Sequence, residues 1–94
     1  IASGGVRNGV DVAKVLALGA SLASLSQPIL QSATKGVEET YHTLSSMIEE
    51  LRNVMFLVGA GSVDQLHGAP VVITGKTSEW LRARGFSIEG YAQR

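Results

Sequence analysis

The chain has 94 residues, of which 45% are hydrophobic and 17% charged; this composition excludes a disordered tail and allows one small domain, not two. Eight basic residues balance eight acidic ones, which excludes long-range attraction to nucleic acid or to an anionic membrane. Cysteine is absent, which excludes disulfides and cysteine metal sites and fits an intracellular protein, and no apolar run approaches the roughly 18 residues of a membrane span.

An apolar segment opens the chain and runs straight into a glycine turn. Residues 1–3 read as the end of a strand, followed by Gly4-Gly5. Because natural chains rarely begin inside a strand, we expect these residues to be part of a longer protein. Asn8 and, three residues later, Asp11 predict a capped helix, which Gly19 ends.

A second strand and a short helix follow. Residues 21–25 are a strand candidate, and Pro28 suits the first turn of a helix that continues to Ala33. Strands that alternate with helices imply a parallel sheet. Two buried parallel strands do not stand alone, because their faces and outer edges lack partners. The rest of the sheet is therefore expected from elsewhere.

The longest predicted element is an amphipathic helix over residues 37–58. Its apolar stripe recurs at intervals of four and three residues, which predicts a helix that faces a core. The glycines of residues 59–61 end it. Coiled-coil pairing is the competing interpretation. The stripe consists of Val37, Tyr41, Leu44, Ile48, Leu51, Met55 and Val58, widened by Met47 and Val54.

The last third predicts two short helices and a loose end. Ser62 begins one helix, and Thr77 caps another, which carries Trp80 and stops at Gly85. We interpret Trp80 as a packing anchor, against the flank of a barrel or a neighbouring subunit. Residues 87–94 are polar and are expected to be loosely held.

Two polar loops at strand-to-helix junctions are the candidate binding residues. Gly4 and Gly5 let backbone N–H groups approach an anion, and Arg7 adds a charged fork of donors. In the second loop, Ser26 and Gln27 offer a hydroxyl, an amide and free N–H groups. In (β/α)8 barrels, the last two such loops and a short extra helix form a recurrent phosphate site. The competing interpretations are a surface glycine turn and a polar helix cap.

No catalytic or metal-binding set is visible in the sequence. His42 lies in the long helix and His67 in a predicted loop, and neither has a partner at ligand spacing. Glu49 and Glu50 are adjacent and therefore point in different directions from a helix. We expect no catalytic residue and no metal ligand here.

Nearly the whole chain resembles the type 2, FMN-dependent isopentenyl-diphosphate isomerases. The glycine–arginine motif is shared by several FMN and phosphate-binding barrels, whereas the C-terminal segments make the resemblance specific. The segments that carry it are Ile1-Ala2-Ser3-Gly4-Gly5-Val6-Arg7-Asn8-Gly9, residues 11–14 and 17–20, Glu50-Leu51-Arg52, residues 55–61 and 72–76, Glu79-Trp80-Leu81 and Arg84-Gly85.

The resemblance implies an α/β fold, the C-terminal fragment of a TIM (β/α)8 barrel. Residues 1–61 are then the last two βα units with the phosphate-binding loops and a short extra helix, and residues 62–94 a C-terminal helical extension. By position, Gly4, Gly5, Val6 and Arg7 match the first loop that holds the FMN phosphate, and Ser26 and Gln27 match the second. Gln27 departs from the small or apolar residue that the family usually has there.

The implied activity is the interconversion of isopentenyl and dimethylallyl diphosphate in isoprenoid biosynthesis. Reduced FMN is the implied acid/base group, with NAD(P)H as reductant and Mg2+ on the substrate diphosphate, in a cytoplasmic homo-oligomer. The catalytic and metal-binding residues of the family lie on earlier strands, so the chain alone is expected to be inactive. Its uncovered strand edges and apolar helix faces also predict self-association.

Two alternatives remain open at this point. One is the same region of another FMN barrel, of the 2-hydroxy-acid oxidase type. The other is a non-catalytic helical module that dimerises through the long helix. An anion site beside Gly5 would favour a flavin enzyme, and an empty loop with a helix–helix interface would favour the module.

Overall fold

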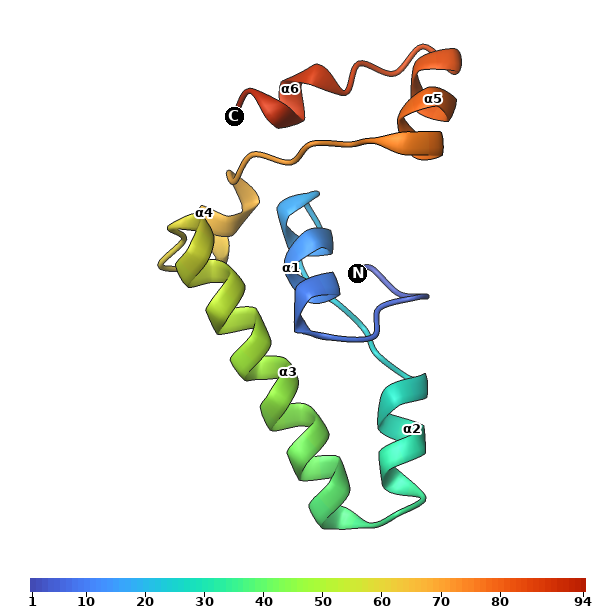
Figure 1. Cartoon of the computed structure of the whole chain (residues 1–94), viewed down its shortest axis with the longest axis vertical. Coiled ribbons are helices and arrows are strands. Elements are labelled where there is room, and N and C mark those ends of the chain that lie inside the picture. The colour runs from blue at the N-terminus through green and yellow to red at the C-terminus, as the bar shows by residue number, and fades with distance from the viewer.

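A computed structural model describes all 94 residues, which form six helices, one of them much longer than the others (Figure 1). The longest helix, α3, forms a spine; α1 and α2 lie on one side of it, and α5 and α6 cross beyond the end that carries α4. None of the six combines the length and hydropathy that a bilayer span requires. The helices are α1 (Gly9–Ala17), α2 (Gln27–Ala33), α3 (Val37–Val58), α4 (Val63–His67), α5 (Gly75–Ala83) and α6 (Glu89–Ala92).

The two predicted strands pair in parallel, but only over a single bridge. Ala2 pairs with Ala23: the Ala2 N–H donates to the Leu22 carbonyl, and the Ser24 N–H donates to the Ala2 carbonyl, both at 2.8 Å. The predicted neighbours and direction are correct, whereas the predicted strand lengths are wrong. Extended segments need further strands and a covered face to form a ladder, and Leu22 remains exposed. By itself the chain is therefore mostly helical and not α/β.

The predicted first helix is confirmed, with one difference in its cap. The Asn8 side chain accepts from the Asp11 N–H at 2.9 Å, and Gly19 follows the helix with a φ of 109°. The Asp11 carboxylate, however, accepts from the N–H of Arg7 at 3.2 Å, not from that of Asn8. The acidic residue thereby connects α1 to the glycine loop that precedes it.

The next two helices also begin and end where the sequence predicts. Pro28 lies in the first turn of α2, where its missing N–H costs no helix hydrogen bond. Helix α3 spans Val37–Val58 and ends at Gly59, whose φ of 76° is left-handed. The Ala60 N–H then donates to the Met55 carbonyl at 2.8 Å and closes the last turn.

Helix α1 crosses α3 at Gly9, where the two backbones come into close contact. A Cβ at this position would lie 2.6 Å from the backbone nitrogen of Leu51 and would also overlap the Met47 carbonyl. No side-chain rotation relieves a clash with backbone, so only glycine fits this crossing. Gly9 is therefore required by packing and not by its own backbone conformation.

The core lies where α1, the C-terminal end of α3 and α4 meet. Leu66 is its most buried side chain, with 2% exposed. The small side chains around it let the helices approach closely. The core residues are Ala13, Leu16, Ala17, Ala60, Leu66 and Ala69.

Most of the apolar stripe of α3 lies outside this core. Val37 is 87% exposed and Tyr41 69%, and Met47 is the one buried residue of the helix. The chain exposes 6653 Å², whereas a compact protein of 9.9 kDa exposes about 5,200 Å². Its radius of gyration is 15.1 Å, against about 12.4 Å for a compact chain of this length. The stripe is amphipathic as predicted, but this chain does not cover it.

The C-terminal residues correct two predictions. Helix α5 begins at Gly75, with Thr74 at its N-cap position, so Thr77 lies within the helix and does not cap it. Residues 87–94 are held and not loose. Within them α6 forms, and Ile88 is buried with 5% exposed. The Val71 N–H donates to the Tyr91 carbonyl at 2.8 Å, which ties the two arms of the extension together.

Arg94 fixes the end of the chain to the core. Its guanidinium donates to the Ala17 carbonyl at 3.0 Å and to the His67 carbonyl. These carbonyls stand at the C-terminal ends of α1 and α4, where helices leave acceptors without partners. The core therefore draws on both sides of the division expected at residue 61, and that division stays a prediction.

Candidate functional site

The two predicted loops share one cavity of about 230 Å³. Because the bridged segments run in parallel, the loops that follow Ala2 and Ala23 leave from the same end. Gly5 and Ser26 both line the cavity, and no carboxylate does. Its lining comprises Ser3, Gly4, Gly5, Val6, Arg7, Ser24, Ser26, Gln27 and Pro28.

The glycine turn presents unused donors to this cavity. Gly4 and Gly5 have φ values of 89° and 78°, a backbone conformation that favours glycine. A Cβ at either position would meet open space, so the conformation, and not crowding, requires glycine here. The N–H groups of Gly4, Gly5 and Val6 donate no hydrogen bond within the chain. Three consecutive donors are thus free for an anion.

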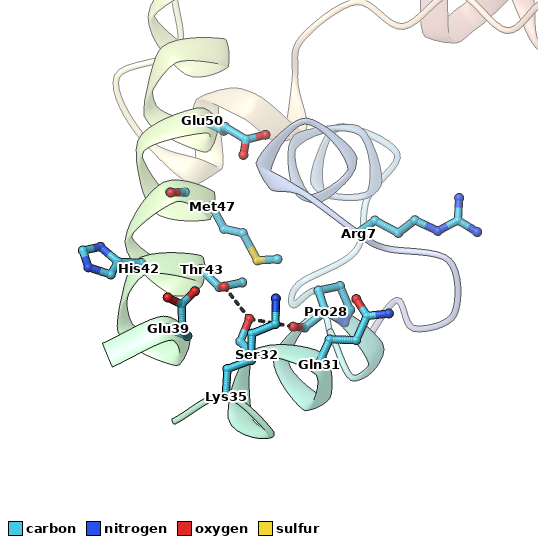
Figure 2. A pocket seen from close by; sticks show the side chains of 11 residues that line it. Arg7, Pro28, Gln31, Ser32, Lys35, Glu39, His42, Thr43, Met47 and Glu50 are labelled. Carbon is cyan, nitrogen blue, oxygen red and sulfur yellow. Dashed lines mark hydrogen bonds between the residues drawn. The ribbon is translucent and has the colours of Figure 1, made fainter. Parts of the chain in front are cut away.

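Arg7 contributes through its side chain. Its backbone N–H is taken by Asp11, whereas its guanidinium forms no ion pair. Arg7 lines both this cavity and the larger one between α2 and α3, and Figure 2 shows its guanidinium extending away from these two helices. An unpaired guanidinium at the edge of a donor-lined cavity suits recognition of a phosphate or carboxylate.

The second loop adds groups that are similarly free. Ser26 lies at the N-cap position of α2, as the helix-cap interpretation predicts, but its side chain forms no cap hydrogen bond. The first backbone bond of the helix runs from the Leu30 N–H to the Ser26 carbonyl at 2.9 Å. The N–H groups of Ser26 and Gln27 therefore remain available beside the cavity.

A larger neighbouring cavity, about 450 Å³ between α2 and α3, has a different character (Figure 2). The Ser32 hydroxyl donates to the Pro28 carbonyl at 3.0 Å and is hydrogen-bonded to Thr43 across the two helices. Lysine, arginine and glutamate side chains line it together, including Glu39 and Glu50. A carboxylate repels an anion, so the smaller cavity suits phosphate better.

The structure contains no cluster of three or more histidine, cysteine, aspartate or glutamate residues that would hold a metal ion. His42 lies on α3 with its ring edge-on to Tyr41, at 6.2 Å between centroids. His67 is the last residue of α4, and its Nε2 is 3.0 Å from the Ala20 carbonyl. The prediction that His67 is an isolated loop residue is therefore wrong: the residue holds α4 to the turn after α1.

Sequence reasoning missed the contact between Asp11 and Arg7. Asp11 was predicted as half of a capping box, which would link it to Asn8. The signal for the actual contact is the position of an acidic residue in the first turn of a helix, directly after a loop whose N–H groups lack partners.

Comparison with known proteins gives a family match over residues 1–73, to the model described as FMN-dependent dehydrogenase. Three curated relatives carry the name isopentenyl-diphosphate delta-isomerase. The protein of Methanothermobacter thermautotrophicus is 45% identical over the whole of this chain, a match that covers 27% of the relative's own length. The protein of Methanosarcina mazei is 48% identical over 95% of this chain and 24% of the relative's length. That of Thermococcus onnurineus is 52% identical over 89% of the chain and 23% of its length. The chain thus spans about a quarter of these relatives.

Proposed function

The chain belongs to the FMN-dependent dehydrogenase family, and from this premise we propose that it is the part of an isopentenyl-diphosphate isomerase that binds the phosphate of FMN. The whole enzyme then interconverts isopentenyl and dimethylallyl diphosphate. The names of the relatives support the activity, and the relatives match the chain over 89–100% of its length.

The observation that carries the proposal is the cavity shared by the two loops. A phosphate dianion needs several donors and no neighbouring carboxylate. The N–H groups of Gly4, Gly5 and Val6 and the guanidinium of Arg7 supply such donors, and the cavity lining contains no acidic residue. Ser26 and Gln27 add polar groups to the same lining. The residues present therefore fit a phosphate group.

The exposed surfaces of the chain support the barrel as the parent fold. The family is one of TIM barrels. The bridge uses one edge of the segment around Ala23, and the N–H and C=O of Ala23 itself, which face the other edge, have no partner. An apolar groove of about 300 Å³ runs beside it, lined by Leu22, Leu44 and Ile48 among others. Further strands and helices would cover this edge and the groove.

The relatives favour the isomerase over the alternative of a 2-hydroxy-acid oxidase. The description of the family model is compatible with both enzymes, whereas the names of the relatives specify isomerases. Family membership and the donor-lined cavity also favour a flavin enzyme over the helical interaction module.

In the proposed enzyme, FMN supplies the acid/base chemistry when bound, and this chain anchors and orients its phosphate. The residues here do not fit a magnesium site, because no three candidate ligands come together. Contacts to Mg2+, NAD(P)H and the substrate diphosphate are therefore expected from other parts of the enzyme. The homo-oligomer and the cytoplasmic location remain predictions from the resemblance.

The experiment is a flavin titration of the intact isomerase that contains these residues. Arg7→Ala removes a charged donor, a loss of about 1.5–3 kcal/mol, so the FMN dissociation constant is expected to rise between about tenfold and a hundredfold. Lys35→Ala is the matched control, because Lys35 lines the neighbouring cavity only. Equal effects of the two substitutions would contradict the proposed site.

A further inference from the structure

Asp11 forms a closed connection between α1 and the glycine loop. Its Oδ2 accepts from the Arg7 N–H at 3.2 Å, and its own N–H donates to the Asn8 side chain at 2.9 Å. The two bonds tie residues 7–11 to one another across the start of the helix. The backbone of Arg7 is therefore fixed relative to α1, although the Arg7 side chain is exposed.

The carboxylate of Asp11 is not part of the lining of the candidate phosphate cavity. The other carboxylate oxygen, Oδ1, lies 3.7 Å from the Lys14 ammonium, and 28% of the Asp11 side chain is exposed. The helix start also favours a carboxylate at this position. Asp11 thus supplies a hydrogen-bond acceptor to the loop, while its carboxylate stays outside the lining of the cavity proposed for the phosphate.

Asp11 accepts from the last N–H of the glycine loop, that of Arg7. By contrast, the N–H groups of the three residues before it, Gly4, Gly5 and Val6, remain without partners beside the cavity. Val6, the residue directly before Arg7, is buried. The backbone is therefore restricted at Val6 by packing and at Arg7 by the hydrogen bond to Asp11.

We propose that Asp11 is a positioning residue for the cofactor phosphate: its carboxylate fixes the backbone of Arg7 and thereby pre-orders the donors of the glycine loop. This inference rests on the proposed function. Pre-ordering raises affinity because the loop does not lose its freedom on binding. Asp11 lies outside the lining of the candidate cavity, so its effect is expected in phosphate recognition and not in the rest of flavin binding.

The test compares FMN with riboflavin, which lacks the phosphate, on the intact enzyme by flavin fluorescence. Asp11→Ala is expected to weaken FMN about tenfold, equivalent to about 1.4 kcal/mol, and to change riboflavin affinity less than about twofold. Asp11→Asn keeps an acceptor oxygen and is expected to restore FMN affinity to within about threefold of the unsubstituted enzyme. Lys14→Ala, which removes only the exposed ion pair, is the control and is expected to leave both flavins unchanged.

Each other outcome overturns the inference. Unchanged FMN binding in Asp11→Ala shows that the loop does not depend on Asp11. Equal weakening of FMN and riboflavin shows a general loss of structure, and failure of Asp11→Asn to rescue shows that the accepted hydrogen bond is not the cause. If the unsubstituted enzyme binds riboflavin as tightly as FMN, the phosphate site and the proposed function are wrong together. A normal FMN preference with an inert Asp11 refutes this inference alone.

Discussion

The two ends of α3 differ in how much of their apolar surface this chain covers. At the C-terminal end, Ala60 and Leu66 are buried against α1, and Arg94 ties the last residues to the same junction. At the N-terminal end, Val37 and Tyr41 are largely exposed, although they belong to the same stripe. One helix therefore contributes both to a finished core and to an open face.

The difference indicates which part of the molecule is self-sufficient. The packed end contains no residue of the candidate site, whereas the loops of the site lie at the start of α1 and α2. The bridge between Ala2 and Ala23 that aligns these loops leaves the outer edges of both segments without partners. The proposed phosphate site is therefore expected to depend on further strands beside this bridge, whereas the packed end forms within the chain itself.

The largest expected effect comes from the crossing that joins the two regions. Gly9→Val puts a side chain into the backbone of α3 and is expected to lower the free energy of unfolding of the intact enzyme by at least about 3 kcal/mol. Urea unfolding measures it. Gly90→Ala is the control, because a Cβ there meets open space in α6 and is expected to change stability by less than about 1 kcal/mol. Similar values for both would show that α1 and α3 can separate without cost.

The packed end is tested by Leu66→Ala. This substitution leaves a cavity among alanines that have little capacity to fill it, and a loss of about 3 kcal/mol is expected. Its counterpart is Leu30→Ala on α2. The Leu30 side chain is exposed in this chain, so its loss is expected to cost less than about 1 kcal/mol if no other segment of the enzyme covers it. A large loss at Leu30 in the intact enzyme would show that another segment covers the open end, which sharpens the comparison.

A smaller effect is expected at the end of the chain. Arg94→Ala removes two charged hydrogen bonds to helix carbonyls and is expected to cost about 1 kcal/mol, with faster amide exchange in α6. Arg84→Ala is the matched control, since Arg84 only stacks on the exposed Trp80 ring at 5.3 Å. Unchanged exchange in Arg94→Ala would restore the interpretation of a loosely held end.

The smallest expected effect depends on pH. The Glu89 backbone N–H first, and then the Arg82 and Ser87 side chains, hold the pKa of the Glu89 carboxyl below its ordinary value of 4.5. Because the folded-state pKa is lowered, the ionised carboxylate stabilises the extension above 4.5, and this stabilisation is lost as the pH falls through the folded-state pKa. The protection factors of the α6 amides, which are corrected for the intrinsic slowing of exchange in acid, should therefore fall as the pH falls, and Glu89→Gln should remove most of that dependence. A pH dependence that persists in Glu89→Gln would assign it to another group.

Local chemistry was sufficient to predict α1 to α4 from the sequence, whereas the N-cap of α5 was assigned wrongly and α6 was missed. Asn8 and Ser62 cap their helices through their own side chains, Gly59 supplies the left-handed residue, and the four–three spacing marks α3. Each of these signals acts within about one helical turn, so the sequence contains it in full. The glycine–arginine loop was recognisable for the same reason.

What the tertiary structure decided involves residues that are distant in the sequence. The strands shrink to one bridge because a sheet needs neighbours on both edges. The close backbone contact at Gly9 forms only when α1 packs on α3. The hydrogen bond from Arg94 to the Ala17 carbonyl joins residues 77 positions apart. Periodicity specifies which face of α3 is apolar, but covering that face requires other segments to pack on it, and only the three-dimensional arrangement decides how much of it is covered.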